Sequence, residues 1–222
     1  ITYGHSNTLP MTVDQMIEHT RAVRRGAPNT MNLVAMPFGS YANPEVAVNN
    51  ALRLMKEGGA EVVKLQGGRD KFDVIKAVAD AGVPVMSHVG MCPHFVNSYG
   101  GFKVQGRTAE DAMCIIDDAK AIEEAGAVGM EIEAVPPEVG KAVDDAVKIF
   151  TFSIGAGGAG CGQLLLGADL IGAFDDFKPK FAKRFGNIGE VADRACSRRA
   201  RGPGVLPATA GGGRGRPQHR RL

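Results

Sequence analysis

Hydrophobic residues recur along this chain in two alternating patterns, one with the period of a helix and one typical of short buried strands. Amphipathic stretches predict helices over residues 12–26, 43–58, 71–80, 108–126 and 137–148. Apolar runs predict strands over residues 29–38, 61–66, 83–88, 127–136, 149–154 and 170–174. A helix followed by a strand, repeated several times, predicts an α/β domain with a mainly parallel sheet.

Residues at the predicted helix ends support this division. Thr12 and Gln15 have the spacing of a capping box, and Asn43 precedes a proline at the first helical position. Glycine, which readily adopts the left-handed conformation that ends a helix, follows four of the helices: Gly26, Gly59, Gly82 and Gly126. The predicted boundaries therefore rest on two kinds of signal.

Polar side chains lie where the predicted strands end. They are Lys64, Gln66, Ser87, His88, Glu131, Glu133 and Ser153. The alternation of helices and strands fits both an open doubly wound sheet and a closed (β/α)8 barrel. Polar residues at successive carboxyl ends favour the barrel, because those ends converge on one mouth.

Two carboxylates on an apolar strand require an explanation. Side chains alternate between faces, so Glu131 and Glu133 share one face while Met130 and Ile132 share the other. Burial of an unpaired carboxylate costs several kcal/mol. A buried carboxylate is therefore usually a reagent, a ligand or half of an ion pair. The sequence of this strand is equally compatible with two structural explanations: a carboxylate in a buried ion pair, or an edge strand with one face exposed to solvent.

Two further residues are candidates for a site. Lys64 shares a face with Gln66 and can hold a carboxylate or stabilise a developing oxyanion; equally, it can pair with Glu131 or Glu133. His88 ends its strand just before a loop, which suits either a functional or a satisfied structural histidine.

A glycine-rich stretch satisfies the pattern of a dinucleotide-binding loop. Residues 155–160 fit GxGxxG after a predicted strand, and Asp175 follows about 20 residues later. Only residues 161–168 are available for the crossover helix, fewer than such a crossover takes. We therefore expect a glycine turn that lets backbone approach a substrate or a neighbouring loop.

Composition indicates a folded body and a different C-terminal segment. Residues 197–222 hold seven of the 26 Lys and Arg residues and no acid, so residues 1–196 carry a net charge of −5. The body gives no electrostatic reason to expect nucleic acid, no apolar run is long enough for a membrane span, and four scattered cysteines suit a reducing cytoplasm. We expect residues 197–222, rich in Gly, Arg and Pro, to be a disordered tail.

Eight motifs, in order, resemble the ketopantoate (3-methyl-2-oxobutanoate) hydroxymethyltransferase family. They are GHSNTLP (4–10), HTRAVRRG (19–26), MPFGSY (36–41), VKLQGG (63–68), SHVG (87–90), GGFKVQGR (100–107), EAVP (133–136) and SIGAG (153–157). The resemblance implies a (β/α)8 TIM barrel of the phosphoenolpyruvate-mutase-like superfamily. On this basis residues 1–196 are a barrel domain with about six of eight strands, lacking the first two.

The resemblance also implies a reaction and its residues. The family transfers a hydroxymethyl group from 5,10-methylenetetrahydrofolate to 2-oxoisovalerate, giving ketopantoate, the first step of pantothenate and coenzyme A biosynthesis. By motif, the catalytic base falls on Glu133, and the substrate-binding lysine and histidine fall on Lys64 and His88. Partners would be the 2-oxo acid and the folate, with neither nucleic acid nor membrane, and a homo-oligomer, in the family a decamer, in the cytoplasm.

The family's magnesium ligands are not retained. One aspartate position is Ala35, a glutamate position is Gln66, and the first ligand belongs to an Asp-Ser pair that precedes the first motif and is missing here. Glu131 stands where the family has an apolar residue. Three hypotheses follow: the family's transfer reaction, a catalytically impaired or inactive homologue serving as a fragment or assembly partner, and a metal-independent 2-oxo-acid lyase or aldolase.

Overall fold

A six-stranded parallel sheet forms the centre of the computed structural model, which describes residues 3–174 and 178–201. The chain divides into two compact units, Ile1–Leu165 and Leu166–Leu222, and the sheet belongs to the first. Its strands are β1 (Leu33–Ala35), β2 (Val62–Lys64), β3 (Val85–Gly90), β4 (Gly129–Glu133), β5 (Phe150–Ile154) and β6 (Gly162–Gln163).

The strands lie side by side in the order in which they occur in the chain, and every neighbouring pair is parallel. A doubly wound sheet reverses its strand order at a switch point, whereas a barrel continues in one direction. The predicted barrel-type winding is confirmed. The described strands number six, where a closed (β/α)8 barrel has eight, so the structure is a partial barrel.

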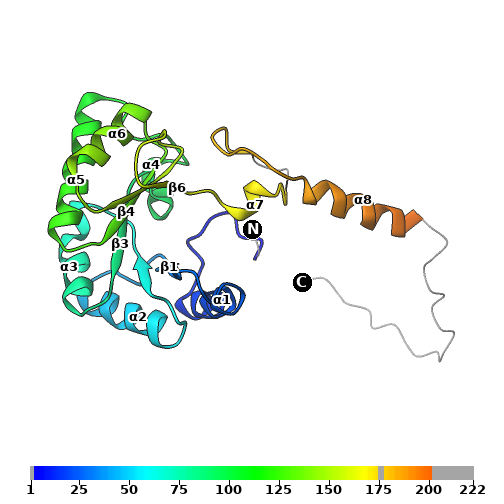
Figure 1. Ribbon diagram of the computed structural model, residues 1–222, viewed down its shortest axis with the longest axis horizontal. Helices are drawn as coiled ribbons and strands as arrows, with labels where there is room; N and C mark the ends of the chain where they lie inside the picture. Colours follow the sequence, from blue (N-terminus) through cyan, green and yellow to red (C-terminus); the bar gives the residue numbers. More distant parts are fainter. Residues whose placement is uncertain (1–2, 175–177, 202–222) are drawn as a thin grey trace, which may run out of the picture. The chain divides into compact units, whose positions relative to one another are not determined.

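Helices follow the strands and cover one face of the sheet (Figure 1). Those of the first unit are α1 (Val13–Gly26), α2 (Pro44–Lys56), η1 (Arg69–Lys71), α3 (Phe72–Asp80), η2 (Pro93–Phe95), α4 (Val96–Tyr99), α5 (Ala109–Glu124) and α6 (Pro137–Ala146). The predicted caps are present: Thr12 and Gln15 form a capping box, and Asn43 Oδ1 accepts from the Val46 N–H at 3.0 Å.

The two faces of the sheet differ in chemistry. Apolar side chains on the face toward the helices join one core with α3 and α5, and include Val63, Leu65, Val85, Val89, Met130 and Ile132. The opposite, inner face carries Lys64, His88, Glu131 and Glu133, whose side chains contact one another. Strand alternation therefore separates packing from candidate chemistry.

The strand predicted over residues 170–174 is not formed, whereas the glycine-rich turn predicted at residues 155–160 is present. Residues 167–170 form the short helix α7 (Gly167–Leu170), followed by a turn in which Gly172 has a φ of 60°, which an extended strand does not accommodate. The sixth strand is instead β6. Residues 155–161 connect β5 directly to β6 through bends, without the crossover helix that a dinucleotide-binding unit requires.

The second unit contains α7 and α8 (Ile188–Arg201), a helix outside the predicted ones. The expected domain boundary at residue 196 falls inside α8, so the first five residues of the expected tail are helical. Residues 202–222, the rest of that tail, lie outside the described residues. Among the described helices, none has the length and apolar character needed to cross a membrane.

Candidate active site

Strand register brings the candidate residues together on the inner face. In the β3–β4 pairing, His88 lies opposite Glu131 and Gly90 lies opposite Glu133. Lys64, at the end of β2, reaches across to Glu131. The sequence predicted each of these residues at a strand end, and the structure places all four in one cluster.

Lys64 and Glu131 form a buried ion pair between Nζ and Oε2. The Glu131 side chain is 4% exposed and that of Lys64 is 15% exposed, so the lysine is the more accessible partner. Burial raises the pKa of Glu131, but the neighbouring charges of His88 and Lys64 and the hydrogen bond from Lys64 outweigh it and lower that pKa overall. Of the alternatives for Glu131, the structure therefore favours half of an ion pair.

His88 lies between the two carboxylates without a well-aligned hydrogen bond. Its Nε2 is 3.2 Å from Glu133 Oε2 and its Nδ1 is 3.9 Å from Glu131 Oε2. Although the first distance is short, its angles are poor, and neither ring nitrogen has a hydrogen-bond partner among the described residues. A ring only 1% exposed with two unpaired nitrogens needs another partner, such as water, an ion or a ligand.

Glu133 is the more exposed of the two carboxylates and stands at a sharp backbone turn. Its side chain is 13% exposed, and the next residue, Ala134, has a φ of 46°, a strained value for a residue with a side chain. The Ile154 carbonyl accepts the Ala134 N–H at 2.9 Å, and the Ala134 carbonyl accepts from Gln105 at 3.0 Å. These bonds hold the turn that ends β4 and direct Glu133 toward His88.

Gly90 makes room for the Glu133 backbone. A Cβ added at Gly90 would lie 2.2 Å from the Glu133 carbonyl oxygen, and Gly90 has a φ of 87°. Only glycine allows this approach. The close contact fixes the position of Glu133 along β4 relative to His88 on the neighbouring strand β3.

The two positions at which the resemblance implies magnesium ligands do not fit that ion. Ala35 has a methyl side chain with no donor atom. The Gln66 amide oxygen already accepts the His94 N–H at 2.8 Å, and the Tyr41 hydroxyl is hydrogen-bonded to His94 Nδ1. Magnesium prefers carboxylate oxygens and near-octahedral geometry.

Three other side chains form a group of potential metal ligands that was not predicted from the sequence. One donor atom each from His88, Glu131 and Glu133 lies within 4.8 Å of the others. An imidazole suits transition metals better than magnesium, and the Lys64 ammonium already occupies an oxygen of Glu131. The group thus does not fit magnesium either. Strand alternation predicts that both carboxylates lie on one face. That His88 lies next to them depends on the register between β3 and β4, which the sequence does not give.

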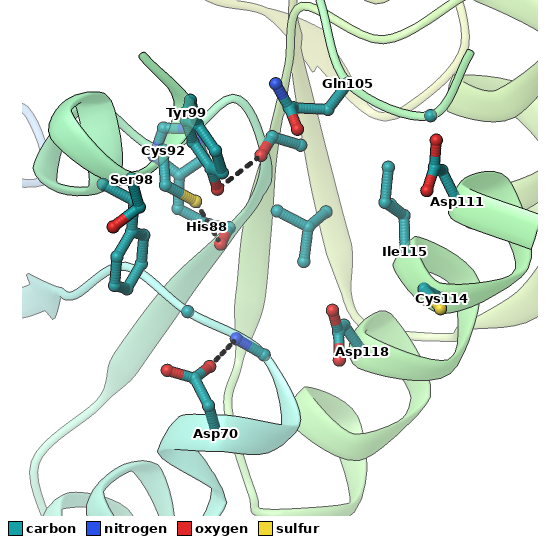
Figure 2. Close-up of a pocket in the computed structure, with 16 residues that line it drawn as sticks. Asp70, His88, Cys92, Ser98, Tyr99, Gln105, Asp111, Cys114, Ile115 and Asp118 are labelled. Carbon is teal, nitrogen blue, oxygen red and sulfur yellow. Dashed lines mark hydrogen bonds between the residues drawn. The ribbon is translucent and has the colours of Figure 1, made fainter. Parts of the chain in front are cut away.

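A hollow of about 400 Å³ lies beside this cluster, between the β2–α3 connection, the end of β3 and α5 (Figure 2). Its charged lining consists of aspartates, Asp70, Asp111 and Asp118, with no lysine or arginine. It also contains Tyr99, whose hydroxyl donates to the Gly90 carbonyl at 3.4 Å, and Cys92, whose thiol donates to the His88 carbonyl. Two of these aspartates are ion-paired, Asp118 with Arg69 at 2.7 Å and Asp70 with Lys71 at 3.2 Å.

Parallel strands in sequential order, connected mostly by helices, place this chain in the (β/α)-barrel class of proteins, in which functional side chains lie at the carboxyl ends of the strands. Within that class, the sequence profile of ketopantoate hydroxymethyltransferase matches residues 1–201. The chain belongs to the ketopantoate hydroxymethyltransferase family.

Curated relatives support this membership. The chain is 51% identical over 193 residues to 3-methyl-2-oxobutanoate hydroxymethyltransferase 1 of Methylibium petroleiphilum, covering 86% of this chain and 65% of that protein. It is 49% identical to 3-methyl-2-oxobutanoate hydroxymethyltransferase of Clostridium novyi, covering 86% of this chain and 70% of that protein. The chain therefore spans about two thirds of the relatives' length, and slightly less for the first.

A solved structure supports the fold. Phosphonopyruvate hydrolase is similar with a TM-score of 0.54 at 15% identity, covering 94% of this chain and 75% of that one. At that identity the likeness concerns architecture alone. It agrees with the predicted (β/α)-barrel fold.

Proposed function

We propose that the protein transfers a hydroxymethyl group from 5,10-methylenetetrahydrofolate to 2-oxoisovalerate, giving ketopantoate for pantothenate biosynthesis. The observation that carries this proposal is the juxtaposition of Glu133 and His88, 3.2 Å apart at the strand ends, beside the Lys64–Glu131 pair. A carboxylate next to polar and cationic groups suits removal of a proton beside a carbonyl. Family membership supplies the substrates.

Glu133 acts as the base in this proposal. It takes the proton from C3 of the 2-oxo acid, and the electrons of that C–H bond form the C2–C3 double bond of an enolate. Lys64 and His88 bind the substrate, with the unpaired His88 nitrogens available to its oxygen atoms. No step is assigned to magnesium, because Ala35 and Gln66 do not fit it.

The second half of the reaction is carbon–carbon bond formation. The enolate carbon attacks the methylene carbon of the folate, which is electrophilic as its iminium ion. The bond from that carbon to the folate nitrogen then breaks, and water supplies the hydroxyl group to the carbon and a proton to the departing nitrogen. Tetrahydrofolate and ketopantoate are the products. We also propose that the protein is cytoplasmic and forms a homo-oligomer, as the family resemblance implies.

Exchange of the C3 proton of 2-oxoisovalerate in heavy water, followed by NMR, tests the base. We expect exchange by the wild-type protein and a loss of about 10²- to 10⁴-fold in Glu133→Gln, the range typical of a general base. Ketopantoate formation with 5,10-methylenetetrahydrofolate tests the full reaction in parallel. Glu138→Gln, a change of the same kind at an acid in the first turn of α6, is the control.

The outcomes distinguish the alternatives. Exchange that survives Glu133→Gln unchanged would contradict the assignment of the base. Exchange without ketopantoate formation would favour a 2-oxo-acid lyase or aldolase. The absence of both would favour an inactive homologue, an alternative supported by the lack of donor atoms at Ala35.

A further inference from the structure

We propose that this site binds 2-oxo acids without a divalent metal, with Lys64 as its built-in cation and Glu131 as the carboxylate that positions Lys64. The inference deepens the proposed function, since it takes the 2-oxo acid as substrate. It concerns how the anion is held, which can be measured separately from hydroxymethyl transfer.

The first step of the argument is the position of residue 35 in the sheet. In the β1–β2 pairing, Ala35 lies directly opposite Lys64 on the same inner face. An acidic side chain at residue 35, as the family resemblance implies, would thus neighbour the lysine. In this chain that neighbour carries no charge, and Lys64 would have no partner on β1.

Glu131 supplies the missing charge from the other side. It belongs to β4, and its carboxylate contacts the Lys64 ammonium across the inner face. In this chain the carboxylate partner of Lys64 therefore lies on β4 and not on β1. Burying Glu131 at 4% exposure would be costly without that partner.

The pair leaves part of Lys64 available to a ligand. An ammonium has three protons, and the hydrogen bonds among the described residues use one of them, to Glu131. Lys64 is also the more exposed member of the pair. Beside it, the two nitrogens of His88 are buried without hydrogen-bond partners. A carboxylate and a neighbouring oxo group would satisfy both sets of polar atoms.

The charges also argue against a divalent cation between these groups. A cation on His88, Glu131 and Glu133 would have to share Glu131 with the Lys64 ammonium, which repels it. At the other family positions, Ala35 offers no ligand and the Gln66 oxygen is engaged by His94. The donor atoms present thus favour Lys64 as the cation of the site.

Titration calorimetry with 2-oxoisovalerate tests this inference. We expect wild-type affinity to agree within about 2-fold in EDTA and in Mg²⁺, Mn²⁺ or Zn²⁺, and to fall at least about 10-fold in Lys64→Met, as expected for a lost charge-assisted hydrogen bond. Lys141→Met removes an exposed lysine of a pair with Asp145 and should bind like the wild type. Thermal unfolding of each variant checks that it is folded.

Three results would overturn the inference: binding that requires a divalent cation, binding that Lys64→Met leaves unchanged, and no binding in any condition. The first would identify His88, Glu131 and Glu133 as a metal site. Metal-independent binding in a protein that forms no ketopantoate would support the inference while contradicting the proposed reaction, so the two proposals can fail separately.

The role of Glu131 has its own test. Glu131→Gln should weaken 2-oxoisovalerate binding about 10-fold, because Lys64 loses the carboxylate that holds its ammonium group in place. The double variant Ala35→Asp/Glu131→Gln returns a carboxylate to the opposite side of Lys64 and should recover binding to within about 3-fold of wild type. A merely structural effect of Glu131 would not be rescued from β1, so failure of rescue in a folded double variant would contradict the positioning role.

Discussion

The two faces of β4 follow different rules although they are built from adjacent residues. Met130 and Ile132 point toward the helices and are buried among apolar side chains. Glu131 and Glu133 point to the inner face, where they contact Lys64 and His88. One face is buried against the protein's own core, and the other presents charges that favour a ligand.

The difference concerns what each face contributes to stability. Burial of apolar area on the helix side is favourable for every residue that joins it. On the inner face, burial of charge is unfavourable until a partner compensates for it, as Lys64 does for Glu131. Substitutions on the first face should therefore lower stability, and those on the second should separate stability from binding and catalysis.

The largest expected effect is on the helix side. Ile132→Ala should lower the free energy of unfolding by about 4 kcal/mol, because it leaves a cavity at a side chain that is 1% exposed. Glu133→Gln, one residue away on the other face, should change it by less than about 1 kcal/mol while lowering proton exchange about 10²- to 10⁴-fold. Urea unfolding of both variants measures the contrast. Similar losses of stability would contradict the separation of the two faces.

The next effect comes from the ion pair. Glu131→Gln should lower the free energy of unfolding at pH 7 by about 3 kcal/mol, because Lys64 is left partly buried and unpaired. The pKa of Glu131 is lowered in the folded protein, so its contribution is present above the ordinary carboxyl pKa and is lost as the pH falls through the folded pKa. The difference between wild type and variant should thus shrink in acid.

Urea unfolding at pH 7 and at several acidic values measures this dependence. Asp145→Asn, which breaks an exposed pair with Lys141, should change little at any pH. A difference between wild type and Glu131→Gln that stays constant into acid would contradict a role for the ionised carboxylate.

Much of the fold was predictable from the sequence because its signals are local. The capping residue Thr12, the Asn43–Pro44 pair and the glycines after the helices each act within a few residues, and the helices begin and end close to them. The prediction of a strand at residues 170–174 was wrong because the signal there is ambiguous. An apolar run does not distinguish a strand from a short helix and turn, and Gly172 decides the matter through its positive φ.

The candidate site was predictable only in part. The alternation of side chains predicted Glu131 and Glu133 on one face and Lys64 at a strand end. The sequence therefore predicted the residues of the site but not their contacts. It could not decide whether Lys64 pairs with Glu131 or Glu133, since that depends on strand register and side-chain reach. The bond between Gln66 and His94 joins residues 28 positions apart through a loop, and no local pattern signals it.

That loop provides the smallest of the expected effects. His94 has its pKa lowered to about 4, mainly because it is buried, with the charges of His88 and Lys64 adding to the effect. Tyr41, whose own pKa is raised by burial, faces it through a hydrogen bond. A histidine in the unfolded chain has a pKa of about 6.5. Between that pH and pH 4 the unfolded state therefore binds a proton that the folded state does not. Stability should decrease over that interval.

The decrease attributable to His94 should be about 2 kcal/mol after allowance for its partial access to solvent. Unfolding curves between pH 7 and pH 4 should therefore be flatter in His94→Gln than in the wild type, while the exposed His5→Gln control should follow the wild type. The backbone N–H that donates to Gln66 is kept in His94→Gln, so the comparison isolates the ring. Equal slopes in all three proteins would mean that the acid sensitivity arises elsewhere, with Glu131 on the inner face as the next group to test.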